Sequence, residues 1–293
     1  MPELPEVETV RRGLDPYVSG ARIEEVTLRR ADLRFPFPAG FKAALEGQTI
    51  TRTDRRAKYL LFRLSSGATW LSHLGMTGSY RFETFRLEEP SRYHEPATGA
   101  RHNHLIVTLS HPGHGPLRLV YTDARRFGFM DLFTDEAACS HLSDLGPEPL
   151  SNAFSAAEMA IRFHGRTAPM KAALLDQRVV AGLGNIYVSE ALHRARIRPD
   201  VPAGRLVLKS GAPSRRLEDL ADSVRSVLAE AIEAGGSTLR DFRAADGASG
   251  YFQHRFAVYD REGEPCATPG CSGTIRRIVQ SGRSSFFCPE CQR

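Results

Sequence analysis

The spacing of the cysteines near the C-terminus constrains the fold more than any other feature of the chain. Two close pairs are separated by a spacer of hairpin length, in the pattern Cys266-x4-Cys271-x16-Cys288-x2-Cys291. Such a pattern can place four thiolates tetrahedrally around a zinc ion, with each sulfur about 2.3 Å from the metal. Because four sulfurs leave no coordination position for water, the spacing predicts one structural Zn²⁺ rather than a catalytic one.

The distribution of cysteines also argues against a secreted, disulfide-bonded protein. Four of the five cysteines lie in the last 28 residues, and Cys139 stands alone, so we expect Cys139 to be a small buried apolar residue. No apolar run approaches the ~20 residues that cross a bilayer, and the start MPELPEVETV is unlike a signal peptide. We therefore expect a cytoplasmic protein of one large or two medium domains.

Basic residues gather in three clusters, although the net charge is only +5. A single cluster is typical of a solvated face, but three clusters, each beside another motif, favour a polyanionic partner. The last cluster includes the spacer between the cysteine pairs, where a hairpin can present arginine to phosphate or to a groove. The clusters are Arg52, Arg55, Arg56, Lys58 and Arg63; Arg125 and Arg126; and Arg276, Arg277, Arg283 and Arg293.

The first half of the chain predicts a β-sandwich that carries an N-terminal helix. Apolar residues at helical spacing predict a helix over 3–19. The polar stretch 84–104 is expected to be a surface loop with solvated histidines, namely His94, His102 and His104. Short strand-like segments separated by turn residues are expected at 23–28, 58–64, 68–74, 105–109, 117–122 and 127–133.

Helices dominate the second half. The sequence Gly146-Pro147-Glu148-Pro149 is typical of a linker, and 244–251 is a glycine-rich loop. The expected helices are 155–164, 169–176, 185–195 and 215–234, the last with Ser214 as its N-cap. The fold class is therefore α+β: a β-sandwich domain over 1–135, a linker over 136–152, a helical domain over 153–253, and a zinc-finger β-hairpin over 254–293.

The N-terminus offers a nucleophile. Proline at position 2 permits removal of Met1, which exposes a secondary α-amine. The pKa of an α-amine is about 7.7–8.0, so roughly one tenth is neutral at pH 7. A neutral amine can attack C1′ of a sugar as its base departs and form a covalent iminium, with Glu3 placed to move protons. Taken alone, Met-Pro-Glu is a common start.

Three short segments offer further candidate site residues. Lys58 heads a strand, the glycine-flanked turn His73-Leu74-Gly75-Met76-Thr77-Gly78 can expose Met76, and Arg125-Arg126-Phe127-Gly128 places two cations beside an aromatic ring. Met, Arg and Phe side chains suit a wedge that fills the space left by an everted nucleotide. Considered singly, residues such as Met76 and Phe127 are core residues more often than not.

A glycine turn separates two of the expected helices, in Gly182-Leu183-Gly184-Asn185. Backbone N–H groups at a helix start and an Asn side chain bind phosphate well, so Asn185 is a candidate phosphate ligand. The spacing is not G-x-G-x-x-G after a strand, which excludes a dinucleotide site.

Together these motifs resemble the formamidopyrimidine-DNA glycosylase family. The likeness covers essentially the whole chain, through Pro-Glu-Leu-Pro-Glu-Val-Glu-Thr, Arg-Arg-Ala-Lys-Tyr-Leu, His-Leu-Gly-Met-Thr-Gly, Arg-Arg-Phe-Gly, Gly-Pro-Glu-Pro-Leu, Gly-Leu-Gly-Asn-Ile-Tyr and the terminal zinc finger. The resemblance implies a monomeric, nucleoid-associated base excision repair enzyme, a glycosylase and AP lyase, that acts on damaged double-stranded DNA. Its substrates are expected to be 8-oxoguanine and formamidopyrimidines, removed by base flipping and followed by β,δ-elimination.

The resemblance also implies roles for the site residues. Pro2 forms the Schiff base, Glu3 is the general acid/base, and Lys58 assists the lyase steps. Met76, Arg125 and Phe127 fill the gap beside Arg126, with Arg125 reading the orphaned cytosine. Asn185 of the helix–two-turn–helix and Arg283 of the zinc finger bind phosphates, Cys266, Cys271, Cys288 and Cys291 hold the zinc, and the loop 244–251 closes over the flipped base.

The sequence departs from the family pattern twice. Ala124 stands where proline often precedes Arg-Arg-Phe, and the first cysteine pair is four residues apart rather than two. Two alternatives stay open at this point. One is endonuclease VIII, a sister enzyme that prefers oxidised pyrimidines, against which Leu4 and the intact Arg125-Arg126-Phe127 segment argue. The other is a non-enzymatic zinc-ribbon module that only binds damaged DNA.

Overall fold

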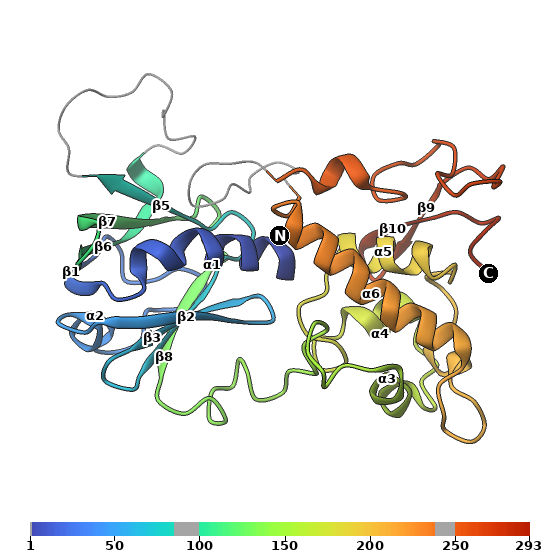
Figure 1. Ribbon diagram of the computed structural model, residues 1–293, viewed down its shortest axis with the longest axis horizontal. Helices are drawn as coiled ribbons and strands as arrows, with labels where there is room; N and C mark the ends of the chain where they lie inside the picture. Colours follow the sequence, from blue (N-terminus) through green and yellow to red (C-terminus); the bar gives the residue numbers. More distant parts are fainter. Residues whose placement is uncertain (1, 85–99, 238–249) are drawn as a thin grey trace. The chain divides into compact units, whose positions relative to one another are not determined.

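The structure is a computed structural model that describes residues 2–84, 100–237 and 250–293. It divides into two compact units (Figure 1). The first comprises Met1–Ser143 and Gly235–Gly250, and the second comprises Asp144–Ala234 and Tyr251–Arg293. No helix in the described ranges is long and apolar enough to cross a bilayer.

The first unit is a sandwich of two antiparallel sheets of four strands each. The order in the first sheet is β1 (Arg22–Leu28), β6 (Asn103–His111), β7 (Gly115–Thr122), β5 (Ser79–Thr84). The order in the second is β2 (Ile50–Arg56), β3 (Tyr59–Leu64), β4 (Thr69–His73), β8 (Phe129–Phe133). The helical segments of this unit are α1 (Leu4–Val18), α2 (Phe41–Leu45) and the short 3₁₀ turn η1 (Ala100–His102).

Helix α1 packs against strands of both sheets, β2 and β3 of one and β6 of the other (Figure 1). Apolar residues recur along it at helical spacing, and four of them are buried in the core between the sheets, namely Val7, Val10, Leu14 and Val18. In the same core, Phe62 stacks on Trp70 with ring centroids 4.1 Å apart, and Phe41 meets Trp70 edge-on. This packing fixes the start of the chain to a rigid scaffold.

The second unit is mainly helical. Helices α5 (Asn185–Arg194) and α6 (Arg215–Glu233) pack on each other, α3 (Ala156–Phe163) packs on α6, and α4 (Met170–Leu175) packs on α5. Strands β9 (Arg276–Gln280) and β10 (Arg283–Phe287) pair as an antiparallel hairpin, and β10 contacts α5. Two 3₁₀ turns complete the unit, η2 (Ala203–Leu206) and η3 (Phe252–Arg255).

The architecture confirms the α+β class, with a β-sandwich, a helical region and a terminal hairpin. The expected helices and strands are present with ends that differ by at most two residues, and Ser214 caps α6 by accepting the Leu217 N–H at 3.4 Å. Strands β2 and β5 and helix α2 were not expected. The domain limits at 135, 152 and 253 stay predictions, and most of the loop 244–251 lies outside the described residues.

One expectation is wrong. The stretch 84–104 is not entirely a loop with solvated histidines, because His104 lies in β6, is only 3% exposed, and has its Nε2 2.7 Å from the carbonyl oxygen of Asp123. Because His104 follows the polar residues Arg101, His102 and Asn103, the sequence gave no signal that its ring faces inward. His102 is half-buried in η1, and His94 lies outside the described residues.

Candidate active site and zinc centre

The start of the chain is buried and held by carboxylates. Pro2 is buried and Glu3 is only 3% exposed. Glu3 is the N-cap of α1, and its backbone N–H donates to Glu6 Oε2 at 2.9 Å in the manner of a capping box. The other oxygen of Glu6 accepts the N–H and hydroxyl of Ser237 at 2.8 and 3.0 Å. Glu6 therefore fixes the residue after Pro2 to the chain segment that precedes residues 238–249.

Glu6 was not among the residues singled out from the sequence. It lies three positions after the N-cap, which is a recognisable capping-box spacing, but the spacing predicts only the local bond. The second bond, to Ser237, joins residues 231 positions apart in the chain. Such a contact has no local signal.

Lys58 and His73 lie at the ends of adjacent strands. Lys58 is 7% exposed and follows Ala57, whose positive φ of 52° forms the tight turn between β2 and β3. His73 ends β4, and its Nδ1 accepts the Gly75 N–H at 3.1 Å. Burial, with the nearby positive charges of Lys58 and Arg34, lowers the pKa of His73 to about 4.

His73 is consequently neutral near pH 7. Because its Nδ1 accepts a hydrogen bond, the single ring proton is on Nε2, which is thus a hydrogen-bond donor. The ring orientation is fixed by stacking on Phe129, with centroids 5.1 Å apart and an interplanar angle of 22°. His73 is a second site candidate without a role assigned from the sequence: it begins the motif His73-Leu74-Gly75-Met76-Thr77-Gly78, but of that motif only Met76 was singled out.

The loops that carry Met76 and Phe127 are joined by Asp123, which is fully buried. Its two carboxylate oxygens accept hydrogen bonds from the Thr77 hydroxyl and, at 2.8 Å, from the Gly128 N–H. The Thr77 hydroxyl oxygen in turn accepts the N–H of Arg125 at 3.0 Å. The structure thus brings together two segments that are about fifty residues apart in the sequence.

Glycines allow these two loops to meet backbone to backbone. Gly75 has a φ of +64°, and a Cβ at this position would collide with the backbone of Phe127 and Gly128. A Cβ on Gly128 would collide with the hydroxyl of Tyr121 and the carbonyl of His73. The glycines of both sequence motifs are therefore required by close approach.

The side chains of the candidate wedge reach the surface. Met76 is 36% exposed and Phe127 is 44% exposed, which excludes the interpretation of both as core residues. The Arg125 guanidinium carbon lies 4.7 Å from the centre of the Phe127 ring. Arg126 is exposed, with a positive φ of 58°.

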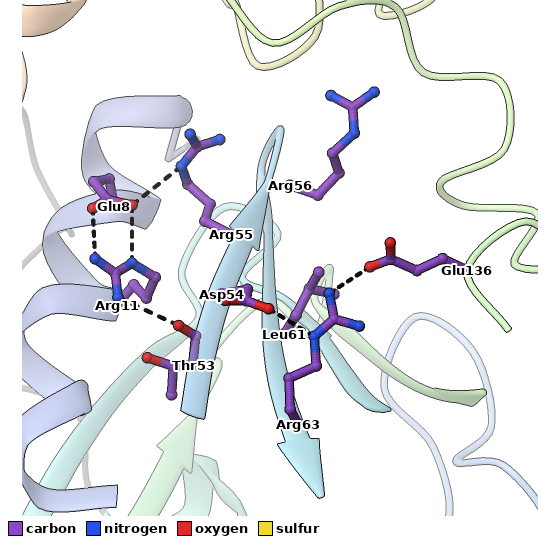
Figure 2. Close-up of a pocket in the computed structure, with 9 residues that line it drawn as sticks. All are labelled: Glu8, Arg11, Thr53, Asp54, Arg55, Arg56, Leu61, Arg63 and Glu136. Atoms are coloured by element: carbon purple, nitrogen blue, oxygen red, sulfur yellow. Dashed lines mark hydrogen bonds and ion pairs between the residues drawn. The ribbon is translucent and has the colours of Figure 1, made fainter. Parts of the chain in front are cut away.

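The basic cluster around β2 is largely paired within the protein. Three of its residues, Arg55, Arg56 and Arg63, line a polar pocket of 510 Å³ (Figure 2). Arg55 pairs with Glu8 at 3.3 Å, and Arg63 pairs with Asp54 at 2.8 Å. Burial raises the pKa of Glu8, but hydrogen bonds from Arg11 and Arg12 outweigh it and lower that pKa. Much of the positive charge in this cluster is therefore already balanced and contributes little to binding a polyanion.

In the second unit, Asn185 is the first residue of α5, and its Nδ2 donates to the Ser284 carbonyl of β10 at 3.1 Å. The preceding turn is shaped by Gln177, which accepts the Gly182 N–H at 2.9 Å and donates to the Leu183 carbonyl at 2.9 Å. Arg283 is exposed at the first position of β10. Asn185 and Arg283 thus belong to two elements that touch.

Lys171 reinforces the contact between the helices and the hairpin. Its side chain is only 2% exposed, and its Nζ donates to the Ser284 carbonyl at 2.6 Å and to the Ser285 hydroxyl at 2.7 Å. Lysines are scarce in this chain, with only four among 39 basic residues. That scarcity was a weak signal for Lys171, since a compact ammonium fits this buried position.

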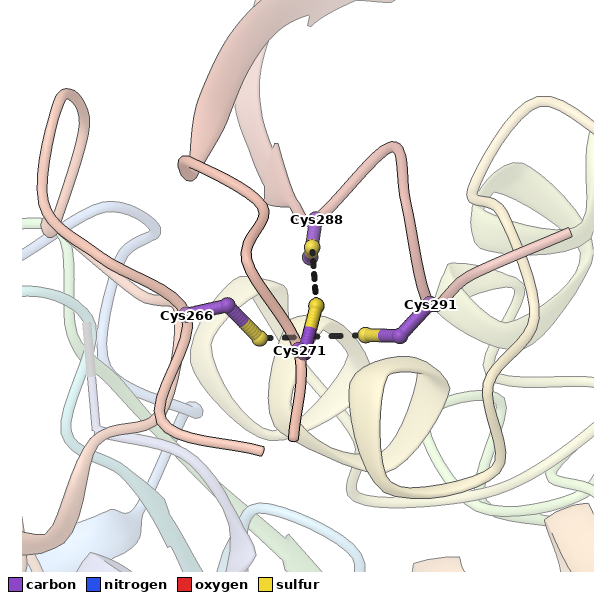
Figure 3. Close-up of side chains that lie close together, drawn as sticks. All are labelled: Cys266, Cys271, Cys288 and Cys291. Carbon is purple, nitrogen blue, oxygen red and sulfur yellow. Dashed lines mark hydrogen bonds between the residues drawn. The ribbon is translucent and has the colours of Figure 1, made fainter. Parts of the chain in front are cut away.

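The four cysteines of the C-terminal pattern come together (Figure 3), with all sulfur atoms within 4.8 Å of one another. The Sγ atoms of Cys266 and Cys291 are 3.7 Å apart, and those of Cys271 and Cys288 are 3.6 Å apart. A tetrahedron with sulfurs about 2.3 Å from zinc has edges of about 3.8 Å, so the residues fit the ion.

Backbone N–H groups support these sulfurs. Thr268 N–H points to Cys266 Sγ at 3.5 Å, and Gly273 N–H points to Cys271 Sγ at 3.4 Å. Gly273 also leaves room for the cluster, since a Cβ there would lie 2.6 Å from Cys288 Sγ. Burial raises the pKa of Cys266, but hydrogen bonds from Thr268 and His193 outweigh it and lower that pKa to about 6. The longer first knuckle therefore still forms a four-sulfur site.

The predicted site residues thus fall into two sets. Those at the N-terminus, at Lys58 and in the two wedge loops lie in the first unit, whereas Asn185, Arg283 and the four cysteines lie in the second. Within each unit the structure gathers residues that are far apart in the sequence.

Comparison with known proteins identifies relatives along the whole chain. Residues 1–130 match the model of the formamidopyrimidine-DNA glycosylase N-terminal domain, residues 145–243 that of its H2TH domain, and residues 263–293 that of a zinc finger found in FPG and IleRS. The chain is 54% identical to a protein of Allorhizobium ampelinum and 53% identical to one of Rhizobium leguminosarum, both called formamidopyrimidine-DNA glycosylase and both covered completely, as is this chain.

Solved structures agree. The wild-type Lactococcus lactis Fpg in complex with DNA containing N7-benzyl-Fapy-dG is 34% identical with a TM-score of 0.82, covering all of both chains. The Thermus thermophilus MutM (Fpg) protein is 42% identical with a TM-score of 0.79, covering 99% of this chain and 98% of the other.

Proposed function

Since the chain belongs to the formamidopyrimidine-DNA glycosylase family of base excision repair enzymes, which carry one structural zinc ion, we propose that it excises 8-oxoguanine and formamidopyrimidines from duplex DNA and then cleaves the strand at the abasic site by β,δ-elimination. The observation that carries this proposal is the buried start of α1, where Pro2 directly precedes a backbone fixed by the Glu3–Glu6 hydrogen bond.

Pro2 is the proposed nucleophile. Once Met1 is removed, its neutral secondary amine attacks C1′ of the flipped nucleotide, the glycosidic bond breaks, and the base leaves with a proton. Glu3 protonates the sugar ring oxygen as the ring opens to the iminium. The iminium withdraws electrons from C2′, so the Glu3 carboxylate, which has given its proton to the ring oxygen, can now take a C2′ proton, and the electron pair of that C–H bond expels the 3′-phosphate. A second elimination, with loss of a C4′ proton to a base, expels the 5′-phosphate.

Lys58 and His73 are proposed to act on the phosphates beside the lesion. The Lys58 ammonium offers positive charge, and the neutral His73 ring offers one N–H donor on Nε2. The ammonium of Lys58 attracts the phosphate through its full positive charge as well as through a hydrogen bond, so Lys58 contributes more to stabilising the leaving phosphate, while the uncharged N–H of His73 orients it.

Met76, Arg125 and Phe127 are proposed to occupy the space that the flipped nucleotide leaves, flanked by Arg126. Their exposure and their rigid support through Asp123 suit this role. An arginine guanidinium can bond the cytosine edge left unpaired, which assigns recognition of the opposite base to Arg125.

Asn185 and Arg283 are proposed to bind phosphates of the kinked strand. The first turn of α5 presents backbone N–H groups beside Asn185. The Asn185 Oδ1 is buried and has no hydrogen-bond partner among the described residues, whereas its Nδ2 has one proton engaged by Ser284 and a second available to a phosphate. We place the enzyme in the cytoplasm beside the nucleoid, because its proposed substrate is chromosomal DNA. We propose a monomer, because one chain carries every residue of the proposed site.

A paired assay tests the substrate class. Single-turnover excision is measured on duplexes that differ only in the lesion, 8-oxoguanine opposite cytosine and thymine glycol opposite adenine. We expect the 8-oxoguanine strand to be cut at least about tenfold faster, in line with the transition-state discrimination that a pocket matched to polar groups provides. Faster cutting of the thymine glycol strand would assign the chain to an endonuclease VIII activity, and binding without cutting of either strand would leave a DNA-binding module.

A further inference from the structure

The first cysteine knuckle is covered by a histidine from outside the zinc finger. His193 lies in the last turn of α5 and is 7% exposed. Its Nε2 lies 3.5 Å from Cys266 Sγ and 3.9 Å from Cys291 Sγ. The ring therefore faces one edge of the four-sulfur cluster, the edge formed by Cys266 and Cys291.

These distances suit a hydrogen bond to sulfur rather than a place in the metal's ligand set. Four thiolates already complete the tetrahedral coordination of a structural zinc. Four thiolates and one Zn²⁺ leave a formal charge of −2 in a half-buried site, and a donated N–H disperses part of that charge. Partners outside the ligand set orient the ligands and tune the affinity of the site.

His193 also contacts the four-residue spacer of the first cysteine knuckle. Between Cys266 and Cys271 lie Ala267, Thr268, Pro269 and Gly270. The Thr268 hydroxyl lies 3.3 Å from His193 Nε2 and 3.7 Å from Cys291 Sγ, and its backbone N–H reaches Cys266 Sγ. The longer knuckle therefore closes against α5 through His193.

The same helix is attached to the zinc finger at its other end. Asn185, its first residue, donates to the Ser284 carbonyl of β10, and Glu190 in the middle accepts the backbone N–H groups of Ala257, Val258 and Tyr259 at 2.8 to 3.0 Å. Helix α5 thus runs along the zinc finger and holds it at three places.

From these contacts we infer that His193 is a positioning residue of the zinc centre: its Nε2–H donates to the Cys266 thiolate, closes the four-residue knuckle on α5, and slows the loss of zinc. This inference concerns the metal site alone and holds whether or not the proposed lesion specificity is correct.

Two substitutions separate the hydrogen bond from simple packing. His193→Phe keeps a ring of similar size without an N–H, and His193→Gln keeps an N–H donor on a side chain of similar reach. His164→Phe, at an exposed position that ends α3, is the matched control. Zinc transfer from each full-length protein to a coloured chelator, 4-(2-pyridylazo)resorcinol, is followed over time.

We expect His193→Phe to release zinc about tenfold faster or more, His193→Gln to recover most of the native rate, and His164→Phe to match the wild type. The same variants loaded with Co²⁺ give a second readout. Without the donated N–H, the more electron-rich thiolate shifts the sulfur-to-cobalt charge-transfer band of His193→Phe to longer wavelength, and the Gln variant reverses the shift.

Two results would overturn the inference. If His193→Phe matches the wild type in zinc release and in the cobalt spectrum, the ring makes no contribution to the site. If the Phe and Gln variants lose zinc equally fast and the charge-transfer band does not move in either, the contribution is packing and not a hydrogen bond.

Discussion

The hydroxyl of Thr77 donates a hydrogen bond to the buried carboxylate of Asp123, and this contact joins the two loops that carry the proposed wedge. The same hydroxyl oxygen accepts the N–H of Arg125. One side chain therefore sets the position of Met76 on one loop relative to Arg125 and Phe127 on the other, before any DNA is bound.

Removing the Thr77 hydroxyl tests whether its hydrogen bonds hold the two loops together. In Thr77→Val the shape is kept, but Asp123 loses a donor and the Arg125 N–H loses an acceptor. We expect the free energy of unfolding to fall by about 1–3 kcal/mol and excision to slow, as measured by urea unfolding and single-turnover kinetics. Thr77→Ser retains the hydroxyl and is the control. Equal unfolding free energies and equal excision rates for the Val and Ser variants would show that the Thr77 hydroxyl does not hold the two loops in place.

The close approach of the two loops predicts that substitution of Gly75 lowers the free energy of unfolding strongly. Gly75→Ala forces a Cβ into the backbone of Phe127 and Gly128 as well as a strained φ. Gly115→Ala imposes a similar positive φ of 71°, with nothing within 4 Å of the added Cβ. We expect the control to lose about 1 kcal/mol of unfolding free energy and Gly75→Ala to lose at least about 2 kcal/mol more. Similar losses in thermal or urea unfolding would contradict the packing argument.

The depressed pKa of His73 predicts a pH dependence of stability. The folded value is about 4, below the ordinary value of 6.5. Between these values the unfolded chain binds the proton and the folded chain does not, so the free energy of unfolding falls as the pH drops through this window, by up to about 3 kcal/mol. His73→Asn keeps an acceptor for the Gly75 N–H but cannot take up a proton.

The difference in unfolding free energy between the wild type and His73→Asn is measured by urea titration at several pH values. We expect the wild type to lose unfolding free energy relative to His73→Asn as the pH falls from 6.5 to 4. Above pH 7 the difference between the two proteins should stay constant. A difference that does not change with pH would mean that His73 is not held neutral.

The proposed phosphate contact of Arg283 predicts a change in salt dependence. The logarithm of the binding constant for duplex DNA falls linearly with the logarithm of salt concentration, by about 0.9 for each phosphate contact. Arg283→Ala should reduce this slope by about that amount. Arg215→Ala, on an exposed face of α6 where Arg215 pairs with Glu218 and Asp219, should leave it unchanged. An unaltered slope for Arg283→Ala would remove this residue from the phosphate contacts.

Local pattern was sufficient to predict much of the fold. Apolar spacing placed α1 and α6, a capping serine placed the start of α6, and paired cysteines placed the zinc centre. In each case the signal and the structure it produces lie within one short segment. Strand β2 was not predicted, because its sequence, Ile50 to Arg56, is dominated by polar residues. Its place in the sheet depends on pairing with β3.

In the candidate site, by contrast, local pattern identified only some of the residues. Lys58, Met76 and Phe127 were singled out within their motifs. Glu6 and His73, which also lie in quoted motifs, and Asp123 were assigned no role. Those three act through partners distant in sequence, such as Ser237 for Glu6 and Thr77 for Asp123. Their importance comes from burial and from contacts that only the tertiary structure creates.

The proposed reaction depends most on the amine of Pro2. Borohydride reduces an iminium to a stable amine, so it traps any covalent intermediate formed during reaction with DNA that contains 8-oxoguanine. The wild-type protein, with Met1 removed, is compared with a form that carries one extra residue before Pro2, and binding of both to the lesion duplex is measured in parallel.

We expect the wild type to form a trapped adduct that peptide mapping assigns to Pro2. The extended form should bind the same DNA with similar affinity, yet form no adduct and cut no strand. Strand cleavage and trapping by the extended form, or an adduct mapped to another residue such as Lys58, would contradict the account.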